Sequence, residues 1–504
     1  MTTLPTGLPV VVDRAAATPL AVQISAQLEA AVTGSVLCAG DRLPSSRDLA
    51  ATLGVSRTVV TNAYARLFAE GWLEGRHGSG TYVADVTPPQ APANEPHRAS
   101  IAPLAAASEP DERAAPSPAP GPRGLIDLQP GISWAEGIEP AAWRRAWRQA
   151  GAHLPSRWPD PHGLSELREE IAAYLRRSRG LAVSPAHVLV TQGVSNGLAL
   201  VADALLTPGD KAGVEEPGYP TGREVLRRAG ARVVPCRVDA HGILPEELPG
   251  DLKLLYTTPA HQYPLGGRLP VSRRQALIAW ARATRALVVE DDYDSEFRYD
   301  VGPLPALHSM DPDVIVYLGT ASKVLATAFG AGWLVAPPEL VAKLADLRPR
   351  LGARIPEPVQ HAVLALLRSG DLERHVRKMR LEYARRRAAL VDGLTRGDRD
   401  TAADGRPAPP RVPFRLLGDT AGMHVVLELP RDYPAARLVD AAAARGVAVY
   451  PLDRYFAGPP TISGLILGYG TATLPQVRRA AAELGQLLSA LRASPHDHED
   501  FSAS

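Results

Sequence analysis

Between residues 125 and 370 the chain alternates short apolar runs with longer helix-like stretches. The apolar runs HVLVTQ, KAGVEE, ARVVPCRV, LKLLYTT, ALVVEDD and VIVYLGT have the length of strands, and segments such as GLALVADALL and RRQALIAWARATR separate them. Strands that alternate with helices predict βαβ units and a mostly parallel sheet, with ligands at the carboxyl ends of strands. The pattern therefore predicts an α/β domain over 125–370.

Near residue 370 the pattern changes. ERHVRKMRLEYARRRAALVDGL predicts one long charged helix, and a mixed α/β segment follows it. We expect a smaller C-terminal subdomain over 371–492, packed beside the sheet. Residues 493–504 are polar and predict a disordered tail.

Residues 13–85 predict a second, smaller domain. PLAVQISAQLEAAVTG repeats apolar residues every four positions, and PSSRDLAATLG begins with a capping box from Ser45 to Asp48. VSRTVVTNAYARLFAEG predicts a further helix, and GWLEGRHGSGTYVA predicts two short strands around a turn. This order of elements is typical of a winged helix-turn-helix. The inward face of the last helix would carry Val60, Tyr64 and Leu67.

The opposite face of that helix is polar. In a winged helix-turn-helix this second helix enters the DNA major groove, where small hydroxyl and amide side chains suit base edges and phosphates. The alternative is a helical packing domain with a solvated face, because residues 13–85 hold six arginines against seven acids. The polar face would carry Arg57, Thr58, Thr61 and Asn62.

GDRLPSSRDLAATLGVSRTVVTNAYARLFAEGWLEGRHGSGTYVA resembles the DNA-binding domain of GntR-type regulators along its whole length. The LPSSRDLA, VSRTVV and GSGTYV segments have the order and spacing of that family. The resemblance implies that Arg47, Ser56, Arg57, Thr58 and Gly80 lie at or near DNA. Thr61 and Asn62 follow only from the geometry of the helix.

Composition separates the two domains and limits their surroundings. Residues 86–124 are rich in Pro, Ala and Ser and predict a linker. The hydrophobic fraction of 45% and the charged fraction of 22% are those of a soluble globular protein, and a net charge of +1 by itself indicates neither nucleic acid nor membrane binding. Two cysteines, no secretory signal and no apolar run of membrane-spanning length predict a cytoplasmic protein with no membrane partner.

Lysine is scarce in this chain, with five lysines among 55 basic residues. One of them, Lys323, ends the segment GTASK directly after a predicted strand. Unlike arginine, lysine forms a Schiff base when its surroundings lower its pKa. Three other predicted strands end in polar segments, namely TQGVSNG, TTPAHQYPLGG and EDDYDSEF.

Each of these strand ends has an ordinary structural interpretation, as a βα turn, a surface histidine or a solvated acidic cluster. Together they suit pyridoxal 5′-phosphate (PLP), which needs an acid beside its ring nitrogen, a donor for its phenolate oxygen and a nest for its phosphate. Asp or Glu at 290–292 and Tyr293 supply the first two, and Gly193–Ser195 with Thr320 and Ser322 supply the nest. No metal site is predicted.

EEPGYP, PAHQYPLGG, EDDYDSEFRY and YLGTASK resemble PLP enzymes of the aspartate aminotransferase fold, and more closely the MocR-type subfamily of GntR regulators. In that subfamily a GntR-type head is joined to a fold type I aminotransferase-like domain. The resemblance implies Lys323 as the Schiff-base lysine, Asp291 as the partner of the ring nitrogen and Tyr293 as the phenolate donor. It also implies that Tyr219 stacks on the ring and that His261 lies beside it. The implied phosphate cup is Val194, Ser195, Thr320 and Ser322. Asp292 remains an alternative to Asp291, since one residue of register decides between them.

Two positions depart from the family pattern. Seven residues after the lysine, where the family carries a phosphate-clamping arginine, this chain has Gly330. Losing a charge-assisted contact of about 1.5–3 kcal/mol would weaken PLP binding by roughly tenfold to a hundredfold. Where aminotransferases hold the substrate carboxylate with an arginine, the register gives Leu465, with Arg454 as the nearest substitute.

The sequence thus predicts a homodimeric transcriptional regulator. Its head would bind operator DNA, and its aminotransferase-like domain would sense PLP or an amino compound that reacts with PLP at Lys323. One alternative is an active PLP-dependent aminotransferase with a vestigial head. The other is a regulator whose large domain has lost PLP.

Overall fold

The computed structural model describes residues 10–14, 19–33, 37–38, 40–69, 73–76, 80–83, 124–299, 306–353, 355–395, 414–418, 421–431 and 433–490. The chain divides into two compact units, Met1–Ser108 and Glu109–Ser504. The boundary falls inside the predicted linker 86–124. That linker, apart from Gly124, and the predicted tail 493–504 lie outside the described residues.

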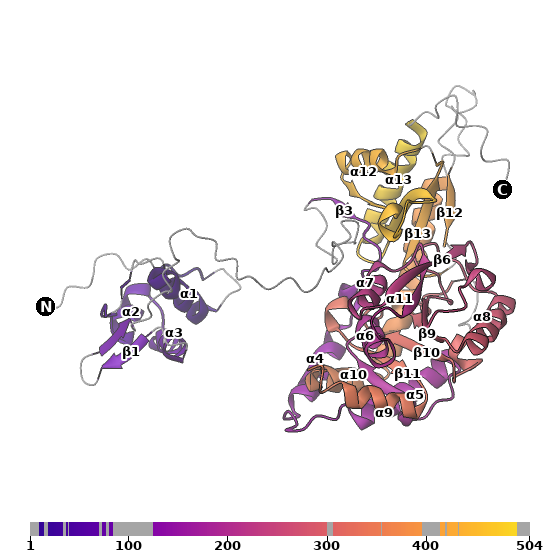
Figure 1. The fold of residues 1–504 in the computed structure, drawn as a ribbon. Helices are drawn as coiled ribbons and strands as arrows, with labels where there is room; N and C mark the ends of the chain where they lie inside the picture. Colours follow the sequence, from indigo (N-terminus) through magenta and orange to yellow (C-terminus); the bar gives the residue numbers. More distant parts are fainter. Residues whose placement is uncertain are drawn as a thin grey trace, which may run out of the picture. The chain divides into compact units, whose positions relative to one another are not determined.

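The described residues of the N-terminal unit form the helices α1 (Leu20–Thr33), α2 (Ser46–Leu53) and α3 (Arg57–Ala69), followed by the antiparallel hairpin β1 (Leu73–Arg76) and β2 (Gly80–Val83) (Figure 1). Ser45 caps α2, because its side chain accepts from the Asp48 amide and donates to the Asp48 carboxylate. Ser45 is therefore the N-cap, as predicted, and the Asp48 carboxylate meets the Ser45 hydroxyl. Apolar residues of all three helices and both strands form one core, including Val60, Tyr64 and Leu67.

The second unit is built on an eight-stranded sheet with the order β4-β11-β10-β9-β8-β5-β6-β7. Strands β10, β9, β8, β5 and β6 run parallel, whereas β11 and β7 are antiparallel to their neighbours. The strands are β4 (Val188–Thr191), β5 (Lys211–Glu216), β6 (Arg232–Asp239), β7 (Gly242–Ile243), β8 (Leu254–Thr257), β9 (Leu287–Asp292), β10 (Ile315–Thr320) and β11 (Gly332–Val335).

Helices cover the two faces of this sheet and bury separate apolar cores (Figure 1). Strands β4, β8 and β10 are buried along their whole length, which explains their continuous apolar runs. The helices of this part are α4 (Pro140–Gly151), α5 (Ser165–Arg179), α6 (Val194–Leu205), α7 (Pro220–Arg228), α8 (Val271–Thr284), α9 (Pro338–Leu347) and α10 (Glu357–Arg368).

The predicted long charged helix is α11 (Asp371–Thr395), and a four-stranded sheet of order β12-β13-β16-β15 follows it. This sheet lies with α12 and α13 at one end of the second unit (Figure 1). Nearby, the short strand β3 (Ile126–Asp127) pairs in parallel with β14 (Val447–Ala448). The remaining elements are β12 (Arg415–Leu417), β13 (His424–Leu429), α12 (Ala435–Ala444), β15 (Tyr450–Pro451), β16 (Ser463–Gly468) and α13 (Leu474–Ala490).

Candidate functional site

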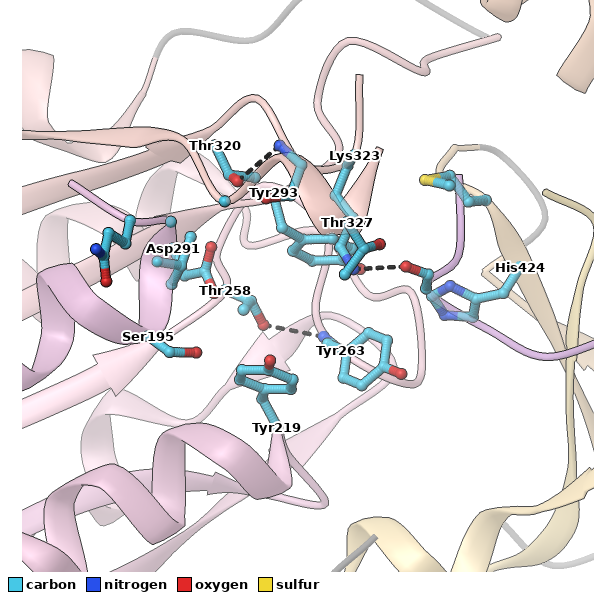
Figure 2. A pocket seen from close by; sticks show the side chains of 17 residues that line it. Ser195, Tyr219, Thr258, Tyr263, Asp291, Tyr293, Thr320, Lys323, Thr327 and His424 are labelled. Atoms are coloured by element: carbon cyan, nitrogen blue, oxygen red, sulfur yellow. Dashed lines mark hydrogen bonds between the residues drawn. The ribbon is translucent and has the colours of Figure 1, made fainter. Parts of the chain in front are cut away.

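A cavity lies at the carboxyl ends of the parallel strands, where an open α/β sheet is expected to bind its ligand (Figure 2). Eight of the nine residues predicted to bind a cofactor line it: Val194, Ser195, Tyr219, Asp291, Tyr293, Thr320, Ser322 and Lys323. Gly131, Gln192, Gly193, Thr258, Tyr263, Thr327, Gly330, Met423 and His424 complete the lining. The ninth predicted residue, His261, is buried behind Tyr293 and is not among the lining residues.

Lys323 follows β10 and reaches into this cavity (Figure 2). Its Nζ donates to the carbonyl oxygen of Gly131 at 2.5 Å. Burial lowers the pKa of Lys323, although Asp291 and Asp294 act in the opposite direction. A depressed lysine pKa increases the fraction of neutral amine, which is the nucleophilic form.

The three carboxylates at the end of β9, Glu290, Asp291 and Asp292, point to different faces of the sheet. Asp291 lines the cavity, whereas Asp292 pairs with the buried Arg179 at 2.5 Å and accepts from Tyr317 at 2.7 Å. Glu290 accepts the backbone amides of residues 307 and 308, both at 2.8 Å. Because adjacent residues of a strand face opposite ways, only the middle carboxylate of the three can meet a ligand in this cavity.

Asp291 carries an unsatisfied atom. Its Oδ2 accepts a hydrogen bond from Tyr256, but its buried Oδ1 has no hydrogen-bond partner among the described residues. Burial, the largest cause, raises the pKa of Asp291 to about 7, and the hydrogen bond from Tyr256 acts against this. Orphaned buried acceptors are rare in folded proteins, so this oxygen is suited to a ligand donor.

Tyr293 and His261 form a polar contact beside the cavity. The Nδ1 of His261 lies 2.9 Å from the Tyr293 hydroxyl and 2.9 Å from Asp294 Oδ2. His424, which begins β13, lines the cavity on the side of the smaller sheet. Burial, followed by the neighbouring His261, lowers the pKa of His424 to about 4, so its ring is neutral near pH 7.

The start of α6 forms an anion cradle with the segment after β10. Gly193 precedes the helix with a φ of 89°, a conformation that favours glycine. A Cβ at Gly193 would lie 3.8 Å from Ser322 Oγ and 3.9 Å from Thr320 Oγ1, so both hydroxyls face the helix start. A helix N-terminus and converging hydroxyls are the groups that bind phosphate.

These residues fit PLP. The cavity brings together a lysine amine of lowered pKa, an orphaned carboxylate oxygen, a tyrosine hydroxyl and an anion cradle. PLP has an aldehyde, a pyridine nitrogen, a phenolate oxygen and a phosphate to match them.

Gly330 takes the place of the family's phosphate-clamping arginine, and it lies at the cavity. Gly330 lines it with a φ of 56°, and a Cβ added there would meet nothing within 4 Å. No arginine is found among the lining residues that the structure describes. Leu465 is fully buried in β16, where it pairs with Leu427, and Arg454 stacks over Tyr450; neither lines the cavity.

Sequence reasoning missed several lining residues. Thr258 and Tyr263 belong to the quoted loop TTPAHQYPLGG, but no signal in the sequence preferred them to His261. Gly131, Met423 and His424 come from segments far from the large sheet in sequence, and no motif indicated them.

In the N-terminal unit the predicted DNA-contacting side chains lie on the exposed surface of α2, α3 and the turn between them. Tyr64, on the inward face of α3, donates to the carbonyl of Pro44 at 2.8 Å and ties the two helices together. The hairpin residue Gly80 begins β2 and is also exposed. The exposed side chains are Arg47, Ser56, Arg57, Thr58, Thr61 and Asn62.

Comparison with known proteins agrees with this two-part organisation. Residues 20–83 match the family of bacterial regulatory proteins called gntR, and residues 133–454 match aminotransferase class I and II. Solved structures with the same fold include an archaeal alanine:glyoxylate aminotransferase, with 25% identity, a TM-score of 0.65, and coverage of 73% of this chain and 91% of that one. Another is the α-aminoadipate aminotransferase LysN of Thermus thermophilus, with 26% identity, a TM-score of 0.64, and coverage of 73% and 93%.

The fold and site therefore define a helix-turn-helix regulator that carries a fold type I aminotransferase-like domain. The pyridoxine biosynthesis regulator PdxR of Corynebacterium glutamicum is 36% identical over 96% of this chain and 99% of its own length. The probable rhizopine catabolism regulatory protein MocR of Rhizobium meliloti is 32% identical over 96% and 97%. The chain belongs to the MocR-type subfamily of GntR regulators, and it is a DNA-binding transcriptional regulator.

Proposed function

We propose that this regulator holds PLP in the cavity around Lys323 and uses it to sense PLP itself or an amino compound that reacts with it. The observation that carries the proposal is the convergence of the Lys323 amine and the orphaned Oδ1 of Asp291 on one cavity. When bound, PLP would supply an aldehyde that reacts with amines.

Different residues of the cavity would bind different groups of PLP. Lys323 would offer its neutral amine, and Asp291 would accept a hydrogen bond from the ring nitrogen. Tyr293 would donate to the phenolate oxygen from a hydroxyl that lies 2.9 Å from His261 Nδ1. The α6 N-terminus with Ser195, Thr320 and Ser322 would receive the phosphate. Tyr219, at the start of α7, would stack on the ring.

The head would bind operator DNA through the exposed residues of α2 and α3 already named. We infer a homodimer, because a two-fold protein matches a symmetric operator. A regulator that reads chromosomal DNA would act in the cytoplasm. Ligand binding and DNA binding would then be reciprocally coupled: if the ligand changes operator affinity, DNA changes ligand affinity by the same factor.

Turnover of amino acids is the weaker alternative. The solved relatives are aminotransferases, which keeps enzymatic activity open. However, Leu465 is buried outside the cavity, and no described arginine lines it to hold a substrate carboxylate. The second alternative is a regulator whose large domain has lost PLP, and the open space at Gly330 favours it. The visible absorption spectrum of the protein with added PLP distinguishes this alternative from the proposed function.

The proposal is tested by operator binding with and without PLP. Addition of PLP should change the operator affinity of the wild-type protein and leave that of Lys323→Ala unchanged. Equal responses of the two proteins would overturn the sensing role, while loss of DNA binding in both would show a folding defect in the preparation.

A further inference from the structure

Two neighbouring carboxylates at the end of β9 each meet one buried tyrosine. Asp292 Oδ2 accepts from the hydroxyl of Tyr317 at 2.7 Å, and Asp291 Oδ2 accepts from the hydroxyl of Tyr256. The two pairs lie on opposite faces of the strand. Only the Tyr256–Asp291 pair adjoins the cavity, although Tyr256 is not among the lining residues.

The ring of Tyr256 is fixed in place. Tyr256 belongs to β8, which pairs in parallel with β9, and it is 2% exposed. Gly222 of α7 lies against the ring, since a Cβ added there would come within 2.9 Å of a ring carbon. The hydroxyl is therefore held at Asp291 by the pairing of β8 with β9 and by the packing of α7 against the ring.

This contact leaves Asp291 with one engaged oxygen and one free oxygen. Oδ2 is taken by Tyr256, so Oδ1 is the atom available to a ligand. The fixed phenol restricts the rotation of the Asp291 carboxylate, which lines the cavity.

The same contact bears on the charge of Asp291. Burial raises the pKa of Asp291 to about 7, with Asp292 on its own strand and Asp294 in the following loop adding to the rise. The hydrogen bond from Tyr256 and the charge of Lys323 oppose it. Removing the phenol removes the larger of these two opposing effects, so the pKa of Asp291 would rise further.

We propose that Tyr256 is a positioning residue that holds Oδ1 of Asp291 towards the cavity, and that it thereby sets the affinity of the site for a pyridine cofactor. The part that concerns the cofactor rests on the proposed function. The part that concerns Asp291 does not.

The test compares Tyr256→Phe with Tyr317→Phe in the full-length protein. Both variants remove one phenol from one buried carboxylate, but Tyr317 lies on the face away from the cavity. The Asp291 carboxyl is titrated by infrared difference spectroscopy of the cofactor-free protein, with Asp291→Asn to assign the signal. PLP affinity is then measured from about pH 6 to about pH 9, which extends about one unit on either side of the expected midpoints of about 7 and about 8.

In Tyr256→Phe we expect the Asp291 midpoint to rise by about one unit, and PLP affinity at about pH 7.5 to fall by about threefold with the ionised fraction of Asp291. The loss of affinity should shrink as the pH passes the new midpoint. Tyr317→Phe should match the wild type in both measurements. If Tyr256→Phe does not fold, Tyr256→Gln keeps a neutral donor and should give a smaller shift in the same direction.

An unchanged midpoint in Tyr256→Phe, or an equal change in Tyr317→Phe, would overturn the proposal. If Tyr256→Phe shifts the Asp291 midpoint but the wild-type protein binds no PLP, the positioning of Asp291 is supported and the proposed function is refuted. The two failures are therefore distinguishable.

Discussion

The amine of Lys323 donates to the backbone carbonyl of Gly131 at 2.5 Å, across 192 residues of sequence. Gly131 lies a few residues after β3, where the chain enters the second unit from the predicted linker. Ser133 reinforces the contact, because its hydroxyl donates to the carbonyl oxygen of Ser322 at 3.1 Å. A ligand that bonds to the Lys323 amine must break the hydrogen bond between this amine and the Gly131 carbonyl oxygen.

Hydrogen–deuterium exchange of residues 129–134 should therefore rise when PLP is added, since a contact that orders this segment is lost. Cofactor-free Lys323→Ala should already show the higher exchange and should not respond to PLP. The paired strands β6 and β7, of which no residue lines the cavity, serve as the internal control and should not change. Identical exchange of the segment in a wild-type protein that has bound PLP would contradict the prediction.

The pKa of Asp291 predicts a pH-dependent stability. Its folded pKa of about 7 lies above the ordinary value of 3.8, so the folded state binds an extra proton between these values. The stability that the neutral carboxyl contributes is present below about pH 4 and is lost as the pH rises through about 7.

Asp291→Asn should therefore stabilise the cofactor-free protein at about pH 8 by roughly 2–4 kcal/mol in free energy of unfolding, with the advantage vanishing by about pH 4. Chemical denaturation at several pH values measures this. Asp440→Asn, on the exposed side of α12, is the matched control and should give no pH-dependent difference. A constant difference across the pH range for Asp291→Asn would contradict a pKa of Asp291 that folding raises.

Arg57 begins α3 and is exposed on the predicted DNA face. Arg57→Ala should weaken operator binding and, if the side chain meets a phosphate, reduce the salt slope by about 1. Operator titrations at several salt concentrations test this. Arg144→Ala, an exposed arginine of α4, should bind DNA as the wild type does. Equal affinity of Arg57→Ala and wild type would count against the placement of α3 in the groove.

Gly330→Arg should restore a cation to the phosphate cradle. Open space surrounds the position, and the cost of its left-handed backbone for a non-glycine residue is roughly 1 kcal/mol. We expect PLP affinity to rise about tenfold to a hundredfold. Gly352→Arg is a close control, with a φ of 64° and equal space outside the cavity. No gain for Gly330→Arg over this control would show that the cradle needs no guanidinium.

Much of this architecture could be predicted from local pattern. The six apolar runs correspond to β4, β5, β6, β8, β9 and β10. Buried parallel strands such as β8 and β10 are continuously apolar, which makes them visible in the sequence. The antiparallel β11 was not predicted. It lies in the small-residue stretch after Lys323, and its place between β4 and β10 depends on pairing that no local pattern encodes.

The site was predictable only up to one residue of register. EDD marks a strand end, and alternation separates Asp291 from its neighbours, but only packing against Tyr256 and Arg179 shows which face meets the cavity. His424 and Met423 could not be found, because they reach the cavity through the fold of the smaller sheet. The placement of His261 behind Tyr293 likewise depends on its contact with Asp294.

Binding of PLP by Lys323 is the claim on which the proposed function depends, and the visible absorption spectrum is its sharpest test. Purified wild-type protein, as isolated or after addition of PLP, should show the visible band of lysine-bound cofactor, which borohydride reduction should fix to the chain at Lys323. Lys323→Ala should lack the band, and Lys343→Ala, a control lysine on α9, should keep it. A wild-type protein that stays colourless with excess PLP would contradict the claim.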